Sequence, residues 1–357
     1  MKKVCVATYC EWSSYGSVMQ SLGLKNALES IGCQSYVVKD RVAPLTKIKI
    51  PVRIGKSPKS IIVNSYNSLI RKKTEKRYEN SVKFIKNSVD IIYYNDYETL
   101  KKNPPVADYY IAGSDQIFHP DLCRPLFFLE FLNNDKKRLT YAASMGKTVV
   151  SKSKEEAFKD LVSKIDTVSV REKEMVDVLS KYTSKDINVH IDPTFLTEKE
   201  VWRKYEREYK LKKPYILVYA IYWDRKLNRE LKKLRKKTGY DIVLLGTGFS
   251  TVYGNKKIYD ADPGQFLWLI DNAEAVVTSS FHGVAFSLIF NKKLSAVVNP
   301  ALPSRINDLL DLLNVEKKEI TSVLDFNLEN YNQINEQIEK ERNRSITYLK
   351  EILEINE

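Results

Sequence analysis

Short apolar segments alternate with helical segments along the whole chain, and this alternation constrains the fold more than any other feature. Between the apolar segments, hydrophobic residues recur at helical spacing. The alternation predicts an α/β fold built on parallel sheets. We expect strands at residues 4–8, 35–38, 109–112, 138–144, 167–170, 215–221, 241–245, 275–278 and 294–298. We expect helices at 18–31, 62–87, from about 172, and at 224–237, 263–272, 283–290, 304–313 and 330–357.

The predicted elements fall into two halves, separated by a charged stretch at residues 198–213 that has no strand pattern. We therefore expect two Rossmann-like doubly wound domains facing a cleft, over residues 1–205 and 206–329. The terminal helix at 330–357 is expected to pack back on the first domain. A length of 357 residues fits two such domains. Ligands of doubly wound sheets lie at the carboxyl ends of the strands, so polar residues there are the first candidates for a site.

The formal charge of +13 is concentrated in two segments. Residues 47–86 carry a net charge of +10 and residues 225–237 a net charge of +7, which leaves −4 for the rest of the chain. The first segment has few interleaved aromatic residues, so we expect no nucleic-acid partner. Docking of this segment on an anionic membrane surface and a solvated basic face both fit the pattern.

The cysteines and the short sequence motifs exclude several classes of protein. None of the four cysteines forms a C-x-x-C pair, and no histidine completes a zinc site, so we expect reduced thiols and no metal. The chain has no signal peptide and no apolar stretch that could span a membrane, which predicts a cytoplasmic protein. It also lacks a Walker A loop, a G-x-G-x-x-G fingerprint and a G-x-S-x-G elbow. Kinase, dehydrogenase and α/β-hydrolase functions therefore lose support.

The strongest local signal lies at residues 276–283, where an apolar strand runs into Ser279, Ser280, His282 and Gly283 at a helix start. Free N–H groups at a helix N-terminus suit a phosphate or a carboxylate. An imidazole beside them can exchange a proton near neutral pH. A structural role for His282 fits the sequence equally well.

Two further charged residues follow predicted strands. Arg171 follows the strand at 167–170 and is expected to point into the cleft and clamp an anion; the alternative is an ion pair with Glu172 or Glu174. Asp115 could accept a proton or hold a sugar hydroxyl; the alternative is a helix cap. Asp192 precedes a proline and is predicted to be a turn residue.

These residues resemble the polysaccharide pyruvyl transferase family over most of the chain, from Tyr15 to about Leu313. Six motifs occur in the family's order: Y-G-S-V-M-Q (15–20), Y-I-A-G-S-D-Q (110–116), L-T-Y-A-A-S-M-G (139–146), V-S-V-R-E-K (168–173), I-D-P-T-F-L (191–196) and T-S-S-F-H-G (278–283). Each motif alone is weak, but six in the same order are fairly specific.

The resemblance implies a two-domain fold of the glycosyltransferase B type and transfer of a ketal-pyruvyl group from phosphoenolpyruvate to two hydroxyls of one sugar. It implies no metal and no cofactor, with phosphoenolpyruvate as co-substrate. Arg171 matches the family arginine that grips phosphoenolpyruvate, and His282 matches the histidine of the donor site. The second domain is then expected to be the donor side and the first the acceptor side.

The chain departs from the family pattern in two places. Many members have arginine where this chain has Ser280, and we expect Arg305 to replace that contact with the donor anion. The first motif often has asparagine where this chain has Ser14, which weakens an acceptor-binding role for that loop.

The resulting expectations assign a role to each candidate residue. His282 handles the proton, Arg171 binds the donor anion and Asp115 activates a hydroxyl. The donor-binding residues are Arg171, Ser279, Ser280, His282, Gly283 and Arg305, and the acceptor-binding residues are Gly16, Gln20, Gly113, Ser114, Asp115, Gln116 and Ser144.

The expected pathway is the synthesis of bacterial surface polysaccharide, such as capsule or exopolysaccharide. The expected acceptor is a polyprenyl-diphosphate-linked sugar at the inner face of the membrane, where residues 47–86 would dock. Two other functions stay open: a nucleotide-sugar-dependent glycosyltransferase of the same architecture, and a non-enzymatic membrane-associated polysaccharide-assembly protein.

Overall fold

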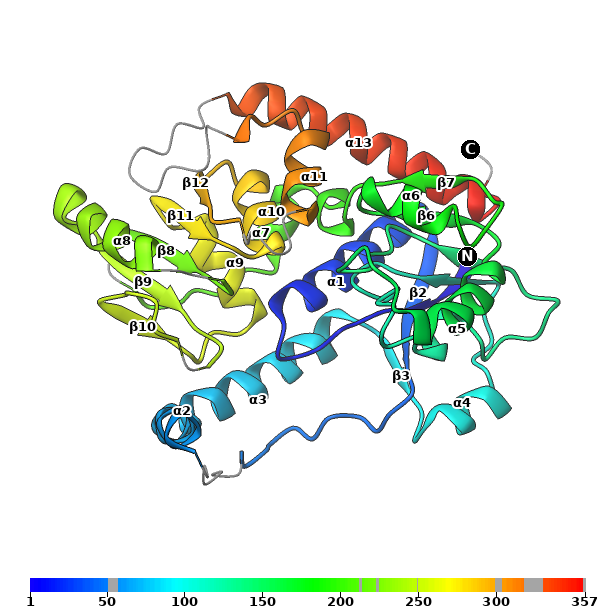
Figure 1. The fold of residues 1–357 in the computed structure, drawn as a ribbon, viewed down its shortest axis with the longest axis horizontal. Coiled ribbons are helices and arrows are strands. Elements are labelled where there is room, and N and C mark those ends of the chain that lie inside the picture. The colour runs from blue at the N-terminus through cyan, green and yellow to red at the C-terminus, as the bar shows by residue number, and fades with distance from the viewer. Residues whose placement is uncertain are drawn as a thin grey trace.

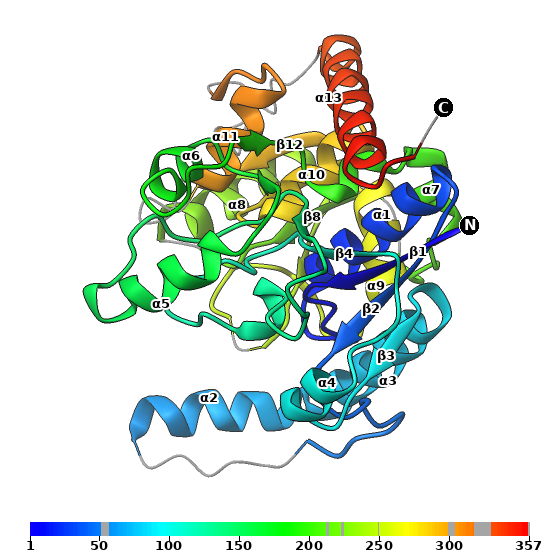
Figure 2. The same ribbon diagram turned by 90° about the vertical axis from the view of Figure 1, so that its right-hand side faces the viewer.

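The computed structural model describes residues 1–50, 57–211, 214–222, 225–248, 250–298, 304–317 and 330–355, except for the side chains of Lys59 and Ser304. Two parallel sheets lie side by side, each covered by helices on both faces (Figure 1, Figure 2). The expected α/β fold, with two Rossmann-like halves that share a cleft, is confirmed. The division of the chain at residue 205 remains a prediction.

The first sheet has the strand order β3-β2-β1-β4-β5, and all its pairings are parallel. A short parallel pair, β6 and β7, continues this sheet through isolated bridges from Leu139 to Thr167 and from Ala143 to Val170. The strands are β1 (Lys2–Ala7), β2 (Cys33–Lys39), β3 (Ile91–Tyr93), β4 (Tyr109–Ala112), β5 (Arg138–Thr140), β6 (Val168–Val170) and β7 (Ile187–Val189).

The second sheet repeats the same order, β10-β9-β8-β11-β12, again with parallel pairings. Its central strands β8 and β11 are buried along their whole length, as expected where helices cover both faces of a parallel sheet. The strands are β8 (Tyr215–Tyr219), β9 (Asp241–Leu245), β10 (Lys256–Ile258), β11 (Ala275–Thr278) and β12 (Lys293–Ala296).

Polar side chains cap several of the helices. Ser14 caps α1 by accepting a hydrogen bond from the Ser17 N–H, and Asp262 caps α9 with Gln265 as its reciprocal partner. The helices are α1 (Tyr15–Ser30), α2 (Pro58–Leu69), α3 (Arg71–Ser88), α4 (Tyr97–Lys102), α5 (Lys152–Ser163), α6 (Glu174–Leu179), α7 (Lys199–Lys204), α8 (Arg225–Thr238), α9 (Pro263–Asp271), α10 (Phe281–Ile289), α11 (Ser304–Leu312) and α13 (Tyr331–Ile352), with 3₁₀ turns η1 (Pro125–Phe128) and η2 (Pro193–Leu196).

The two halves share one apolar core. Tyr15 at the start of α1 stacks on Phe266 of α9, with ring centroids 4.8 Å apart, and its hydroxyl donates to the Ala261 carbonyl at 2.8 Å. Because α1 belongs to the first half and α9 to the second, this packing sets how the loops of the two sheets face each other.

Several sequence expectations about single elements are wrong. The helix expected at 62–87 is two helices that meet at Ile70, where no glycine or proline marks the change of direction. The strand expected at 138–144 ends at Thr140. Strands β3, β7 and β10 have three residues each, too few to show a period. Asp224 and residues 51–56 of the basic segment lie outside the described residues.

Candidate active site

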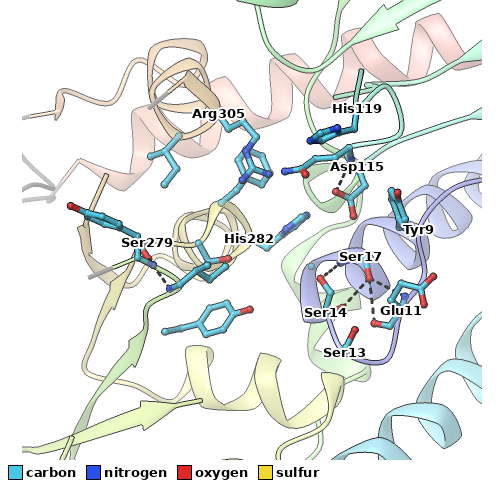
Figure 3. A pocket seen from close by; sticks show the side chains of 18 of the residues that line it. Tyr9, Glu11, Ser13, Ser14, Ser17, Asp115, His119, Ser279, His282 and Arg305 are labelled. Carbon is cyan, nitrogen blue, oxygen red and sulfur yellow. Dashed lines mark hydrogen bonds between the residues drawn. The ribbon is translucent and has the colours of Figure 1, made fainter. Parts of the chain in front are cut away.

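The carboxyl ends of both sheets open onto one cavity of about 410 Å³, called here the first cavity. In each sheet the strand order reverses between two central neighbours, so that successive strands are added outward on either side of them. These neighbours are β1 and β4 in the first sheet and β8 and β11 in the second. Such switch points are where doubly wound sheets bind ligands. Figure 3 shows His282 and Ser279 on one side of the first cavity and Asp115, His119 and Ser17 on the other.

Three helices from different parts of the chain begin at the first cavity. Ser14, Gly16 and Ser17 at the start of α1 line it, as do Ser280 and His282 at the start of α10. Arg305 and Ile306 at the start of α11 line it as well. None of these helices has an acidic residue in its first turn. Two carboxylates, Glu11 and Asp115, line the cavity as well and come from the loops after β1 and β4. The three helix starts favour an anionic group beside them.

The turn between β11 and α10 is held by a chain of hydroxyl groups. Thr278 Oγ1 donates to the Tyr219 carbonyl at 2.6 Å and accepts from the Ser280 N–H at 3.1 Å. Ser280 Oγ accepts from the Gly283 N–H at 3.4 Å and caps α10. A Cβ at Gly283 would lie 2.2 Å from Thr278 Oγ1, so only glycine permits this turn. The turn places His282 inside the first helical turn.

Ser279 joins the loops that follow β8 and β11. Its Oγ accepts hydrogen bonds from the Ile221 N–H at 2.8 Å and the Tyr222 N–H at 2.7 Å. Both lone pairs of the hydroxyl are then used, so its proton is available to a ligand in the first cavity. The donor-binding role expected for Ser279 remains a prediction.

The His282 imidazole is held between α1 and a buried carboxylate. A Cβ at Gly16 would lie 2.0 Å from Nδ1, so the ring lies directly against the backbone of α1. On the other side, Nε2 lies 3.7 Å from Oδ2 of Asp192, which is an ion-pair distance rather than a hydrogen-bond distance. His282 lines the first cavity, while Gly16 and Asp192 fix the position of its ring.

Asp192 is a residue whose role the sequence did not reveal. It does form the predicted turn, because Oδ1 accepts from the Thr194 N–H at 3.0 Å. Its buried Oδ2 also accepts from Nη1 of Arg171 at 2.6 Å and faces His282. Burial alone would raise the pKa of this carboxyl, but His282 and Arg171 outweigh burial and hold the pKa well below its usual range. Asp192 is therefore a charged group behind the imidazole.

Arg171 lies behind the first cavity instead of lining it. Its Nη1 pairs with Asp192, its Nε donates to Glu172 Oε1 at 3.0 Å, and its guanidinium packs 4.2 Å from the centroid of the Phe281 ring. Burial opposes the charge, but Glu172 and Asp192 hold the pKa above its usual value. The ion pair with Glu172, the alternative interpretation of the sequence, is present and is buried.

Arg305 is the one lysine or arginine among the described residues that line the first cavity. Burial and the nearby charge of Arg171 lower its pKa, although Glu172 and Asp115 oppose this effect. Within the described ranges no carboxylate lies at ion-pair distance from its guanidinium. Arg305 therefore lines the first cavity without a carboxylate partner among the described residues, and its contact with the donor anion remains a prediction.

Asp115 and Gln116 also line the first cavity. Asp115 has a left-handed backbone with φ of 71°, which is uncommon outside glycine and is often found at functional sites. Its Oδ1 accepts from the Gln116 N–H at 2.8 Å, which leaves Oδ2 as the other acceptor.

The remaining acceptor-site candidates support the loops and do not line the cavity. Ser114 Oγ donates to the Ala142 carbonyl at 2.5 Å, and Ser144 Oγ donates to Glu172 Oε1 at 2.8 Å. Gly113 has φ of 130° and lies against the Tyr141 carbonyl. Gln20 Nε2 donates to the Tyr9 carbonyl at 2.7 Å. Of the seven expected acceptor-binding residues, Gly16, Asp115 and Gln116 line the first cavity.

Several residues that line the first cavity were not expected from the sequence. Tyr9, Glu11 and Tyr222 follow β1 or β8, so their positions at strand ends could have suggested them. His119 comes from the irregular loop after β4 and gives no such signal. Its Nδ1 is buried without a hydrogen-bond partner among the described residues. The unexpected residues are Tyr9, Glu11, Ser13, Ser14, Ser17, His119, Leu122, Tyr219, Ile221, Tyr222, Phe281 and Ile306.

Within the described residues, no three His, Cys, Asp or Glu side chains are grouped as metal ligands. The expectation that the enzyme needs no metal or cofactor remains a prediction. A search of the described helices finds none long and apolar enough to cross a membrane.

Comparisons with known proteins agree with this architecture. The family model for polysaccharide pyruvyl transferase matches residues 15–299. A UDP-GlcNAc 2-epimerase from Methanocaldococcus jannaschii is similar in structure, with a TM-score of 0.53 and 11% identity over 97% of this chain and 99% of that one. A UDP-GlcNAc 2-epimerase from Neisseria meningitidis, solved with UDP-GlcNAc bound, has a TM-score of 0.51 and 11% identity, with both chains covered to 100%. At this identity the likeness shows the fold alone. The search of curated protein sequences found no match.

Proposed function

Since the chain belongs to the polysaccharide pyruvyl transferase family, and is thus a transferase, we propose that it moves a pyruvyl group from phosphoenolpyruvate onto two hydroxyls of one sugar as a ketal. Phosphate is released. The main support is the first cavity, where Arg305 and three helix N-termini surround His282. Phosphoenolpyruvate carries a carboxylate and a phosphate close together, and binding both takes several cationic or N–H-rich groups.

The donor binds on the side of the second sheet. Arg305 takes one anionic group, and the start of α10, with the Ser279 hydroxyl and the N–H groups of Phe281 and His282, takes the other. Arg171 acts indirectly, because it holds Asp192 in place behind His282. This division of roles assigns the direct donor contact to Arg305 and makes Arg171 a positioning residue.

The reaction then needs one proton delivered and two hydroxyls added. The His282 imidazole gives a proton to the donor methylene, which becomes the methyl group, and the first sugar hydroxyl adds to C2. The C–O bond to phosphate breaks, and the second hydroxyl adds to the same carbon and closes the ring. One hydroxyl proton restores the imidazole and the other leaves with phosphate. Asp115, which lines the first cavity on the side of the first sheet, accepts a proton from a hydroxyl.

The proposed acceptor is a polyprenyl-diphosphate-linked sugar used in bacterial capsule or exopolysaccharide synthesis in the cytoplasm. It would be met at the inner membrane surface through the basic segment at 47–86. The net charge of +10 in this segment supports attraction to anionic lipid.

The decisive experiment incubates the protein with phosphoenolpyruvate and a panel of lipid-linked sugars and follows product mass and phosphate release. We expect the mass of one added pyruvyl ketal and one phosphate for each product. His282→Ala should fold normally and lose turnover by about 10²-fold or more. Arg305→Ala should raise the donor KM.

Three outcomes would contradict the proposal. Release of a nucleoside diphosphate from a nucleotide sugar would establish the glycosyltransferase alternative. Near wild-type turnover in His282→Ala would remove its catalytic role, and an unchanged donor KM in Arg305→Ala would remove its contact with the donor.

A further inference from the structure

A second cavity, of about 200 Å³, lies at the carboxyl ends of β1, β2 and β3 against α3. Its charged lining residues are Lys39, Arg41, Lys86 and Glu11, which gives three cations and one carboxylate. Glu11 lines the first cavity as well, so the two cavities share a wall. Figure 3 shows the Glu11 side chain beside Ser17, on the first-cavity side of this wall. The proposed reaction uses none of the three cations.

Lys39 is the buried member of this group, with 3% of its surface exposed. Its Nζ donates to the Thr8 carbonyl at 2.8 Å and to Glu11 Oε1 at 3.3 Å. Burial lowers the pKa of this lysine, and the nearby Cys10 and Glu11 oppose this effect by raising the pKa. A buried cation is costly unless an anion compensates it.

Glu11 cannot compensate all the positive charge. Its Oε1 is shared between Lys39 and Arg41, and the Arg41 side chain is half exposed. Lys86, in the last turn of α3, is exposed and has no ion pair within the described ranges. The second cavity therefore has an excess of two positive charges at an opening that solvent and ligands can reach.

From this excess charge and the shared wall we infer that the second cavity binds the phosphate or diphosphate that joins the acceptor sugar to its carrier. The sugar itself then extends past Glu11 into the first cavity. This inference rests on the proposed function. The second cavity, at about 200 Å³, is about half the size of the first cavity and has room for a small anion.

The carrier would leave through the open side of the second cavity. Val42 lines this cavity and is 67% exposed, and Leu45 beyond it is 69% exposed. These apolar side chains offer a path for a polyprenyl chain, but the phosphate contacts would serve a nucleotide carrier equally well. Both carriers present the same phosphate group to the second cavity, and the test therefore has to distinguish them.

The test compares acceptor kinetics in the double variant Arg41→Gln/Lys86→Gln, with Lys83→Gln as the matched control on the same helix. Lys83 is exposed on α3 and does not line the second cavity. Three acceptors carry the same sugar, linked to polyprenyl diphosphate, to a nucleoside diphosphate or to a methyl group. We expect the double variant to raise the KM for the true phosphate-linked acceptor about tenfold or more. The KM for the methyl glycoside and the KM for the donor should stay unchanged.

The carrier whose KM rises identifies the source of the phosphate. An unchanged KM for both phosphate-linked acceptors, or an equal rise for the methyl glycoside, would overturn the inference. Lys83→Gln should behave as wild type with all three acceptors.

A binding measurement separates this inference from the proposed function. Calorimetry with inorganic diphosphate is done in an Arg305→Ala background, which weakens anion binding in the first cavity. We expect binding in that protein and its loss when Arg41→Gln and Lys86→Gln are added. If this holds while no pyruvyl transfer is found, the proposed function fails and the second cavity remains an anion site. If transfer is found and neither substitution affects binding, the inference about the second cavity fails alone.

Discussion

At the scale of single residues, Gly16 sets the position of the proposed catalytic ring. No side chain larger than hydrogen fits there, because a Cβ would lie 2.0 Å from Nδ1 of His282. The glycine was expected to contact the acceptor, and it does line the first cavity. Its backbone also lies directly against the His282 imidazole, so α1 of the first half fixes the position of a ring that belongs to the second half.

Gly16→Ala should therefore displace His282 without unfolding the protein. A shift of about 1 Å at a reacting group costs about 10²-fold in turnover, and we expect a fall of that size in kcat. Gly248→Ala is the control, because a Cβ there meets only Asn67 Oδ1 at 3.9 Å. Measuring kcat and the melting temperature of both variants checks this, and a wild-type kcat in Gly16→Ala would show that the ring position is unimportant.

His190 makes the stability of the fold depend on pH. It is buried, its Nδ1 hydrogen-bonds Ser169 Oγ at 2.8 Å, and its ring packs against Tyr348. Burial and the nearby charge of Arg344 lower its pKa to about 4. In the unfolded chain a histidine has a pKa of about 6.5, so between these values the unfolded state binds more protons than the folded state.

The unfolding free energy should therefore fall by about 2–3 kcal/mol from pH 7 to pH 4.5 through His190 alone. Above pH 7 the group has no further effect, and below about pH 4 its loss is complete. Denaturant unfolding at several pH values measures this, with His190→Gln as the variant that does not titrate. The same pH slope in wild type and variant would assign the effect to other groups.

At the scale of elements, the basic segment forms two unlike helices from Pro58 onward. α3 packs one face against the body of the protein, with Tyr78, Val82 and Ile85 buried. α2 has no buried residue among those described and carries Ile62, 61% exposed, and Leu69, 84% exposed. Figures 1 and 2 show α2 lying along the edge of the molecule. A helix with exposed apolar side chains within a basic segment is typical of binding at a lipid interface.

We predict that the protein co-sediments with vesicles in proportion to their anionic lipid content, because each basic residue near the surface contributes about 1 kcal/mol. Ile62→Ser/Leu69→Ser should weaken this binding by removing the apolar contact. Val106→Ser, at an equally exposed apolar residue far from α2 in sequence, should have no effect. Sedimentation that does not depend on the anionic lipid content would favour a basic face that is only solvated. Equal sedimentation of all three proteins would show that Ile62 and Leu69 do not contact the lipid.

At the scale of the whole molecule, α13 joins the two halves. It runs across the top of the molecule in Figure 1, from α11 and β12 of the second half to β6 and β7 of the first. Its Arg342 donates to the Phe195 carbonyl at 2.8 Å, and its Tyr348 hydroxyl donates to the Thr140 carbonyl at 3.2 Å. The helix buries Ile334, Ile338, Tyr348 and Leu349 in the shared core.

A chain that ends at residue 330 should lose this packing and expose the core it covers. We expect a melting temperature lower by more than 10 °C, because the burial of several large apolar side chains is lost at about 1.5–3 kcal/mol each. Calorimetry and limited proteolysis check this, with a chain shortened only to residue 355 as the control. An unchanged melting temperature would mean that the two halves hold together without α13.

Much of the fold could be predicted because its signals are local. The limits of β4, β9 and β11 agree with the sequence prediction, since each is an apolar run bounded by polar residues or glycine. The helix break at Ile70 and the three-residue strands β3, β7 and β10 could not be predicted, because neither leaves a local signal.

The candidate site could be predicted in part for the same reason. His282, Asp115 and Arg305 line the first cavity because each follows a strand, or begins the helix that follows one, and those positions can be recognised from the sequence. Arg171 also follows a strand, yet it lies behind the cavity. Its direction depends on Glu172, the next residue in the chain, and on Asp192, which no local pattern places beside it.

The sequence by itself determined that parallel sheets carry polar motifs at their carboxyl ends and that the charge of +13 comes from two segments on a slightly acidic body. The spacing of the apolar residues is enough to predict the sheets, and the charges of the side chains are enough to locate the two basic segments. Only the tertiary structure decided which charges meet. It places Asp192 between Arg171 and His282, and Glu11 between two cavities. Such pairings form when loops from distant parts of the chain pack together at the carboxyl ends of the strands. The local sequence pattern does not record which distant segments will pack together.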